Sequence, residues 1–187
     1  MRYDPKFVPM TVDEFLSIDF PSDKKFELVD GVIRMMAGGS VAHSLVASNV
    51  MALLRNGLRG TGCRPFGSDM GLIVNRTNLR YPDIAVYCRH EWSDGELLEQ
   101  KLEDPTVIFE ILSPSTDRND QGAKLDEYRT IDSLQTVVFV DPAQELTRVV
   151  QRIGPTSWRD DLFAQPHDVE LPSLKLIIPH AEIFARD

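Results

Sequence analysis

Three charged residues in this sequence have types and positions that suggest chemistry. Asp83 stands in "YPDIAVYC", Glu110 stands in the middle of the apolar run "TVIFEILS", and Lys124 follows in "QGAKLDEYR". A carboxylate that leaves water without a partner costs several kcal/mol. The apolar neighbours of Glu110 therefore predict a buried acid whose charge is compensated by another group.

Strand geometry brings the two acids together if their strands are neighbours, because alternate residues of a strand share a face. Two carboxylates about 4 Å apart repel by about 4 kcal/mol at an effective dielectric constant near 20. A shared proton or a divalent cation such as Mg²⁺ relieves that repulsion. Lys124 adds a positive charge from the next helix, and Tyr128 lies one helical turn further on the same face.

Two acids, a cation and a lysine suit the hydrolysis of a phosphodiester, in which negative charge develops on the phosphate. A purely structural interpretation stays open for each residue. Asp83 can cap a strand, Glu110 can form an ion pair with Arg80 or Lys124, and Lys124 can be a solvated helix residue.

The elements that position these residues are read from apolar periodicity and turn signals. Thr11 and Glu14 have capping-box spacing for a short helix, and Asp30-Gly31 is a type I′ turn signal for a hairpin over residues 26–39. Helices are expected over residues 40–60, 117–131 and 180–187, and a charged loop over 89–104. Strands are expected over residues 68–75, 81–88, 106–113, 136–141, 146–153, 157–164 and 173–179. The order predicts a mixed α/β chain around one twisted sheet.

Composition narrows the class of protein. The 187 residues suit a single domain over 1–187 with an ordinary soluble balance, at 42% hydrophobic and 26% charged. No apolar run approaches the roughly 20 residues of a membrane span, and no signal peptide is recognisable, so a cytoplasmic protein without a membrane partner is expected. The net charge of −9 disfavours strong non-specific binding to nucleic acid, although it allows a local basic groove.

Neither the cysteines nor the histidines have metal-site spacing. Cys63 and Cys88 stand alone, and reduced structural thiols are expected. The four histidines form no local cluster of the HExxH kind, so a histidine-rich metal site is not expected.

The segments "YPDIAVY", "VIFEILSPSTDRND" and "KLDEYRTIDSLQTVVFVDP" resemble the PD-(D/E)XK nuclease-like superfamily. Within it, the pattern is similar to a bacterial family of largely uncharacterised proteins described as putative restriction endonucleases. "FELVDGVIRMMAGGSVAHSLVASNV" and the C-terminal region from Ser157 are also similar to that family. The resemblance implies a restriction-endonuclease-like core, a mixed α+β arrangement with a twisted mixed sheet flanked by helices. It also implies a metal-dependent endonuclease acting on DNA with Mg²⁺ or Mn²⁺, and a homodimer.

The resemblance assigns roles residue by residue. Asp83 matches the PD position and Glu110 the (D/E) position, which makes both metal ligands, with the carbonyl of Ile111 as a third. The lysine position two residues after Glu110 holds Leu112 instead, and Lys124 on the following helix replaces it as the catalytic lysine. Glu27 matches an N-terminal acidic position that reaches the metal or its water, although a surface carboxylate is an equal alternative.

Several further residues are candidates for contact with substrate. His43, at the start of the long helix, can touch a phosphate, although a capping or partly buried histidine is the alternative. The other candidates lie near the acidic strands or on the helix of Lys124; they are Arg80, Tyr81, Arg89, Arg118 and Tyr128. Two other functions remain open, a non-catalytic binding or regulatory module of the same fold and a hydrolase of a smaller phosphate ester.

Overall fold

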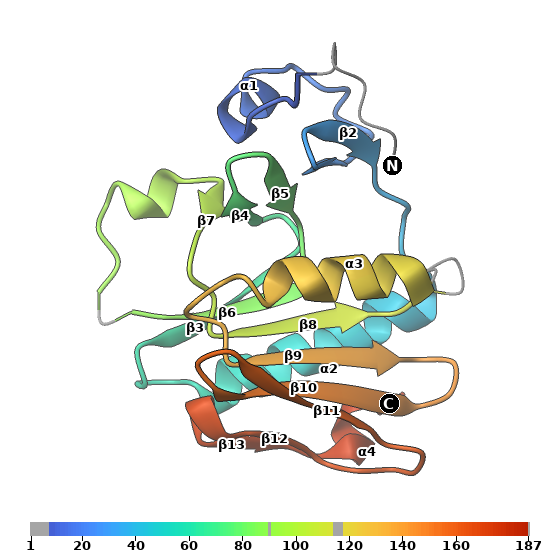
Figure 1. Ribbon diagram of the computed structural model, residues 1–187. Coiled ribbons are helices and arrows are strands. Elements are labelled where there is room, and N and C mark those ends of the chain that lie inside the picture. Colours follow the sequence, from blue (N-terminus) through green and yellow to red (C-terminus); the bar gives the residue numbers. More distant parts are fainter. Residues whose placement is uncertain (1–7, 90, 114–117, 187) are drawn as a thin grey trace.

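A computed structural model describes residues 8–89, 91–113 and 118–186, with only the backbone described for residues 118–120. Its strands form two large sheets and one small sheet (Figure 1). The five-stranded sheet has the order β2-β1-β5-β4-β7, and the six-stranded sheet has the order β11-β10-β9-β8-β6-β3. The expectation of one twisted sheet is therefore wrong in one respect, because the N-terminal strands form a sheet of their own.

The bounds of the elements are as follows. The five-stranded sheet contains β1 (Phe26–Val29), β2 (Val32–Met35), β4 (Gly71–Asn75), β5 (Asn78–Arg80) and β7 (Lys101–Leu102). The six-stranded sheet contains β3 (Cys63–Gly67), β6 (Ile84–Cys88), β8 (Val107–Ile111), β9 (Thr136–Asp141), β10 (Leu146–Gly154) and β11 (Ser157–Leu162). β12 (Val169–Leu171) pairs with β13 (Leu176–Ile178). The helices are α1 (Val12–Leu16), α2 (Val41–Gly57), α3 (Arg118–Tyr128) and α4 (His180–Ile183), with 3₁₀ turns η1 (Glu96–Leu98) and η2 (Pro172–Leu174).

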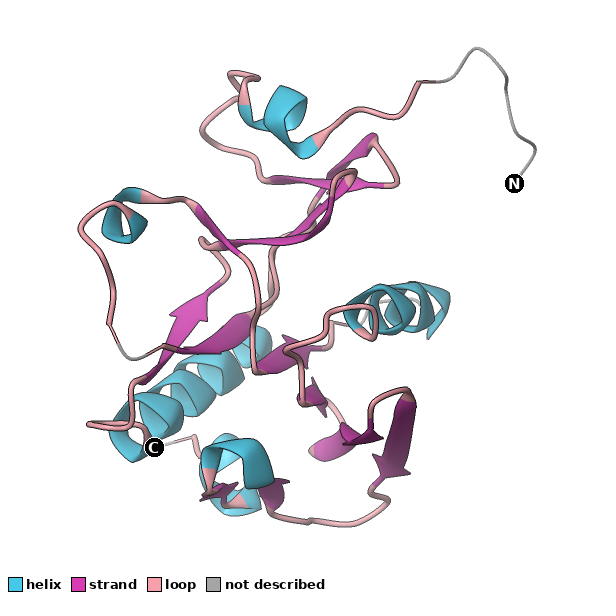
Figure 2. Ribbon diagram, turned by 60° about the vertical axis from the view of Figure 1, so that its left-hand side comes forward, coloured by secondary structure: helices cyan, strands magenta, loops and turns pink. Residues whose placement is uncertain are grey.

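Helices cover both faces of the six-stranded sheet (Figures 1 and 2). On one face, α2 and α4 pack on a core that includes Val46, Val50 and Leu54. On the other face, α3 packs through Leu125 and Tyr128, and Ile131 packs just beyond the end of the helix. Alternate residues of β8 thus enter different cores, and Glu110 lies on the face that α3 covers.

Two local predictions from the sequence are confirmed. Thr11 caps α1, and its backbone N–H donates in return to Glu14, which completes the capping box. Asp30 and Gly31 connect β1 to β2 with φ values of 51° and 74°, the positive pair that a type I′ turn requires. That turn fixes the hairpin register and places Arg34 opposite Glu27.

The chain passes from the five-stranded sheet to the six-stranded sheet within three residues. β5 ends at Arg80 and β6 begins at Ile84, so Tyr81, Pro82 and Asp83 form the whole connection. Asp83 therefore lies where the two sheets meet. Among the described residues, no helix is long and apolar enough to cross a membrane.

The expectation of reduced cysteines is wrong, because a disulfide joins Cys63 to Cys88. The two residues lie directly opposite each other in the antiparallel pairing of β3 with β6. Strand β3, with the sequence "CRPFG", is not among the strands expected from the sequence. It is an edge strand of the six-stranded sheet, the position where proline is tolerated.

Candidate active site

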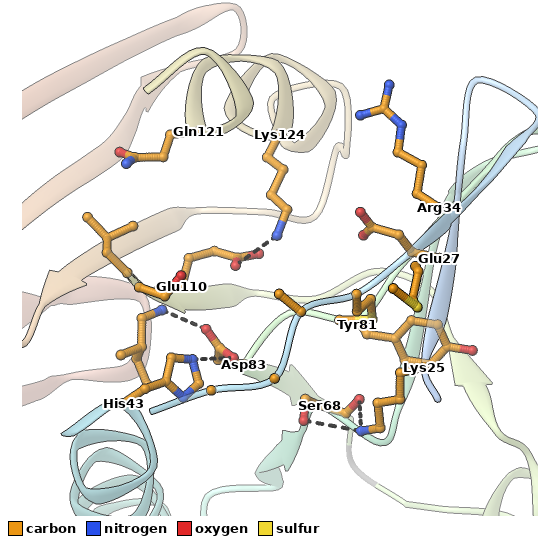
Figure 3. Close-up of a pocket in the computed structure, with 18 of the residues that line it drawn as sticks. Lys25, Glu27, Arg34, His43, Ser68, Tyr81, Asp83, Glu110, Gln121 and Lys124 are labelled. Atoms are coloured by element: carbon orange, nitrogen blue, oxygen red, sulfur yellow. Dashed lines mark hydrogen bonds and ion pairs between the residues drawn. The ribbon is translucent and has the colours of Figure 1, made fainter. Parts of the chain in front are cut away.

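Glu110 is the buried acid around which the site is built. Strand β8 carries it onto the face under α3, and 7% of its surface is exposed. Its Oε1 accepts a hydrogen bond of 2.6 Å from the hydroxyl of Tyr128. Its Oε2 accepts one of 3.2 Å from Nζ of Lys124 (Figure 3). Both partners project from α3, four residues apart, so one helical face provides both donors.

Burial and neighbouring charges shift the pKa values of Glu110, Lys124 and Tyr128. Burial raises the pKa of Glu110 above its ordinary value, the charge of Asp83 adds to the rise, and Lys124 opposes it. The carboxylate of Glu110 in turn raises the pKa of Lys124. Burial raises the pKa of Tyr128 well above its usual range, so this hydroxyl acts as a hydrogen-bond donor.

Asp83 lies beside Glu110 because their strands are neighbours. β6 and β8 are antiparallel, with Ile84 paired to Phe109, and continuing this register by one residue places Asp83 opposite Glu110. Oδ2 of Asp83 accepts a hydrogen bond of 2.7 Å from the backbone N–H of Ile111. Its Oδ1 lies 3.0 Å from Nε2 of His43 (Figure 3).

His43 comes from the first turn of α2, on the opposite face of the sheet. Ser40 caps this helix by accepting from the backbone N–H of His43, which fixes the start of the turn. The imidazole is 18% exposed, and its hydrogen bond to Asp83 raises the pKa of His43. The histidine therefore both reaches the site and is partly buried.

A second buried cluster connects the five-stranded sheet to α3. Arg80 is 1% exposed and donates two hydrogen bonds to Glu127, from Nε at 2.8 Å and from Nη2 at 2.5 Å. Its Nη1 donates to Oε1 of Glu27 at 2.9 Å. Glu127 precedes Tyr128 on α3, and Glu27 lines the same cavity as Glu110. Arg80 thus fixes α3 and the hairpin of Glu27 relative to each other.

A cavity of about 600 Å³ lies between the two sheets, beside Glu110 and Asp83 (Figure 3). It is lined by the expected residues Glu27, His43, Asp83, Glu110, Ile111 and Lys124. It is also lined by residues that sequence reasoning missed, including Lys25, Arg34, Ser68 and Gln121. The register of the Asp30-Gly31 hairpin was a signal that could have identified Arg34, because it places that residue opposite Glu27.

Two expected substrate contacts are corrected by burial. Arg80 has its guanidinium enclosed by two carboxylates, so it is not available to a phosphate backbone. Tyr128 is fully buried, and its hydroxyl donates to Glu110 rather than facing the cavity. Arg89 forms an ion pair with Glu96, and Tyr81 lines the cavity. The side chain of Arg118 lies outside the described residues.

The cavity contains oxygen donors of the kind that a divalent cation binds. In the described part of the chain, no group of three or more His, Cys, Asp or Glu side chains is close enough to bind a metal ion. Oε2 of Glu27, however, is buried in the described structure without a hydrogen-bond partner, and Glu27 lines the cavity of Asp83 and Glu110. An unpaired buried carboxylate oxygen is costly, and Mg²⁺ prefers carboxylate, carbonyl and water oxygens. The donor set therefore fits a hard divalent cation that completes its coordination with carbonyl and water oxygens.

Comparisons with known proteins identify a matching family and similar relatives. The model of the Uma2 family, described as "Putative restriction endonuclease", matches residues 12–180. The uncharacterised protein slr1290 of Synechocystis is 33% identical over 91% of this chain and 88% of its own length. The uncharacterised protein sll1609 of the same organism is 27% identical over 89% of this chain and 95% of its own length.

A solved structure has the same fold. The crystal structure of a putative nuclease belonging to DUF820 from Anabaena variabilis superposes with a TM-score of 0.77. The match covers 94% of this chain and 98% of the other, at 21% identity. The expected mixed α+β architecture is therefore confirmed.

Proposed function

Because the chain belongs to the Uma2 family of putative restriction endonucleases, we propose that it is a metal-dependent nuclease that hydrolyses phosphodiester bonds of DNA. One observation carries this proposal. Asp83, Glu110 and Lys124 line a single cavity, with the buried carboxylate of Glu110 next to both a second acid and a lysine. Such an arrangement concentrates charges of both signs at one point, which suits phosphate chemistry.

Asp83 and Glu110, with the carbonyl of Ile111, are the proposed ligands for Mg²⁺ or Mn²⁺, and Glu27 is the proposed contact to a coordinated water. Such a cation, when bound, supplies Lewis-acid chemistry and neutralises negative charge. The proposed role of Glu27 is supported by its Oε2, which is a buried acceptor without a hydrogen-bond donor in the described structure. The hydrogen bonds to Asp83 from His43 and Ile111 support a fixed orientation of that carboxylate.

Lys124 is the proposed catalytic lysine. It is in an ion pair with Glu110, so at neutral pH it carries its proton and cannot serve as a base. Its ammonium instead stabilises negative charge that develops on the phosphate and orients the attacking water. Tyr128 holds Glu110 from the buried side and leaves the cavity side to substrate. His43 and Arg34, which also line the cavity, are the proposed contacts to the phosphate that is cleaved.

The experiment is a cleavage assay on linear and supercoiled duplex DNA in Mg²⁺, Mn²⁺ and Ca²⁺. The native protein should cut in Mg²⁺ or Mn²⁺, and Lys124→Met and Asp83→Asn should each lose on the order of a hundredfold or more in rate. Lys101→Met is the matched control, because Lys101 lies on β7 away from the cavity. Equal cleavage by Lys124→Met would contradict the assigned role of the lysine. RNA and a chromogenic phosphodiester in parallel test the alternative of a smaller substrate.

A second candidate function is a non-catalytic module of the same fold. It is favoured by one observation, that both oxygens of Glu110 already have protein partners in the described structure. Titration with Mn²⁺ by calorimetry discriminates the two functions. Binding that is lost in Glu110→Gln supports the nuclease, and its absence in the native protein supports the non-catalytic module. A homodimer is also proposed, on the resemblance alone. Light scattering of the same samples tests it.

A further inference from the structure

Charge is distributed unevenly along this chain. Acidic residues outnumber basic residues by 29 to 20, yet no aspartate or glutamate occurs between Asp30 and Asp69. That segment contains β2, the whole of α2 and β3. Its charged residues are arginines, at positions 34, 55, 59 and 64. The segment therefore carries only basic charges in a chain that is acidic overall.

Three of these arginines meet at a cavity distinct from the candidate active site. Arg55 and Arg59, from the end of α2 and the loop after it, and Arg64, from β3, line a cavity of about 650 Å³. Its lining also includes Cys63 and Phe66, and none of the described residues that line it is acidic. All three arginines are exposed, and within the described part of the chain none has a carboxylate within 4.0 Å. We call this cavity, lined by Arg55, Arg59 and Arg64, the arginine pocket.

Several other arginines have acidic partners in the described structure, unlike these three. Arg89, Arg148, Arg159 and Arg186 each form an ion pair with a nearby acid. The dipole of a helix favours positive charge at its C-terminus, which accounts for Arg55 and Arg59. It does not account for Arg64, which projects from an edge strand into the same cavity. Three guanidinium groups held together without an acid repel each other, and an anion relieves that repulsion.

Helix α2 connects the arginine pocket to the candidate active site. His43 lies at its first turn and Arg59 just beyond its last, roughly 24 Å apart along the helix at 1.5 Å per residue. The exposed residues between them include Ser44, Ser48 and Ala52, which carry no charge that would repel a phosphate. Duplex DNA advances about 3.4 Å per base pair, so this distance corresponds to about 7 base pairs.

We propose that the surface from Arg34 along α2 to the arginine pocket binds the phosphate backbone of nucleic acid. This inference rests on the proposed function, because it extends the same DNA from the cavity of Glu110 to a second point of contact. Guanidinium groups suit this partner, since they bind phosphate oxygens through two parallel hydrogen bonds. The position of the arginine pocket predicts that binding depends on base pairs about 7 steps from the scissile bond.

The test measures binding of a duplex of about 30 base pairs by fluorescence anisotropy in Ca²⁺, without turnover. The variant Arg55→Gln/Arg59→Gln/Arg64→Gln is compared with a control of equal charge change, Arg76→Gln/Lys101→Gln/Arg159→Gln, whose residues lie away from α2. The first variant should lose on the order of tenfold or more in affinity. Its plot of log K against log salt should become shallower by about 2 to 3, because each lost phosphate contact removes about 0.9.

The outcomes separate this inference from the proposed function. If the control loses as much affinity as the arginine-pocket variant, or if the latter binds as the native protein does, the inference is overturned and the proposed function stands. If the arginine-pocket variant loses binding while Lys124→Met leaves cleavage unchanged, the inference stands and the role of Lys124 fails. If inorganic pyrophosphate binds at the arginine pocket and the duplex does not bind at all, the choice of nucleic acid as the partner is overturned. Thermal melts of both variants verify that the substitutions leave the fold intact.

Discussion

The guanidinium of Arg80 donates two hydrogen bonds to the carboxylate of Glu127, although the residues are 47 positions apart in the sequence. The same guanidinium holds Glu27, and Arg80 itself is 1% exposed. Because Glu127 lies on the helix that carries Lys124 and Tyr128, this pairing determines where both donors meet Glu110.

We expect Arg80→Met to be strongly destabilising, by about 3–5 kcal/mol, because it leaves two buried carboxylates without their cation. Urea denaturation at pH 7 measures this loss. Arg76→Met, on the turn between β4 and β5, is the control and should change the free energy of unfolding by about 0.5 kcal/mol or less. If Arg80→Met loses no more free energy of unfolding than the Arg76→Met control, the pairing does not hold α3 in place.

Glu110→Gln should leave the metal-free protein at least as stable as the native protein at neutral pH. Burial raises the pKa of Glu110 above 4.5, so between that value and its raised pKa the folded state binds more protons than the unfolded state. Stability attributable to this group therefore falls as pH rises through that window, and glutamine avoids the loss. Urea unfolding in a chelator from pH 4 to 8 follows the difference.

Glu127→Gln is the matched control for Glu110→Gln. It removes a carboxylate that Arg80 pairs, so it should be destabilising at neutral pH. If Glu110→Gln is destabilised to the same extent, the ion pair of Glu110 with Lys124 is mainly structural.

Tyr128→Phe should cost about 1.5–3 kcal/mol at neutral pH, because Glu110 loses a hydrogen bond to a buried oxygen. The hydroxyl lowers the pKa of Glu110, so its removal raises that pKa further. The cost should shrink as pH falls and Glu110 becomes protonated, since a neutral carboxyl needs the donor less. Unfolding curves at several pH values measure this trend, and a cost independent of pH would contradict the coupling.

The Cys63–Cys88 disulfide should contribute about 3 kcal/mol, as estimated from the 25 positions that separate the two cysteines. The variant Cys63→Ser/Cys88→Ser should lose that amount relative to the oxidised protein and match the native protein in reductant. Thiol counting by mass spectrometry verifies the oxidised state. If reductant changes neither the thiol count nor stability, the bond does not form under those conditions.

Local patterns of the sequence predicted much of the fold. The capping box at Thr11, the turn at Asp30-Gly31 and the helical spacing of α2 all depend on residues close in sequence. Alternation along strands also predicted that Asp83 and Glu110 face each other, provided that β6 and β8 are neighbours. The first three of these features follow from chemistry that acts within a few residues.

The remaining features depend on contacts between distant segments. Nothing close to Arg80 in the sequence identifies Glu127 as its partner, so its burial could not be foreseen. The pairing of β3 with β6, which places Cys63 opposite Cys88, joins segments that are distant in sequence. The division of the strands into separate sheets depends on pairings such as β1 with β5, which local sequence does not encode.

The three-residue connection between β5 and β6 has a consequence for protein engineering. Only three residues join β5 to β6. A single residue inserted there would shift Asp83 relative to Glu110 or move Arg80 away from Glu127. The turn at Pro155 and Thr156, between β10 and β11, is exposed and lies outside the lining of the cavity. Peptide tags or fluorescent reporters should therefore be inserted at the second location, where they lengthen a surface turn and leave the spacing of the acids unchanged.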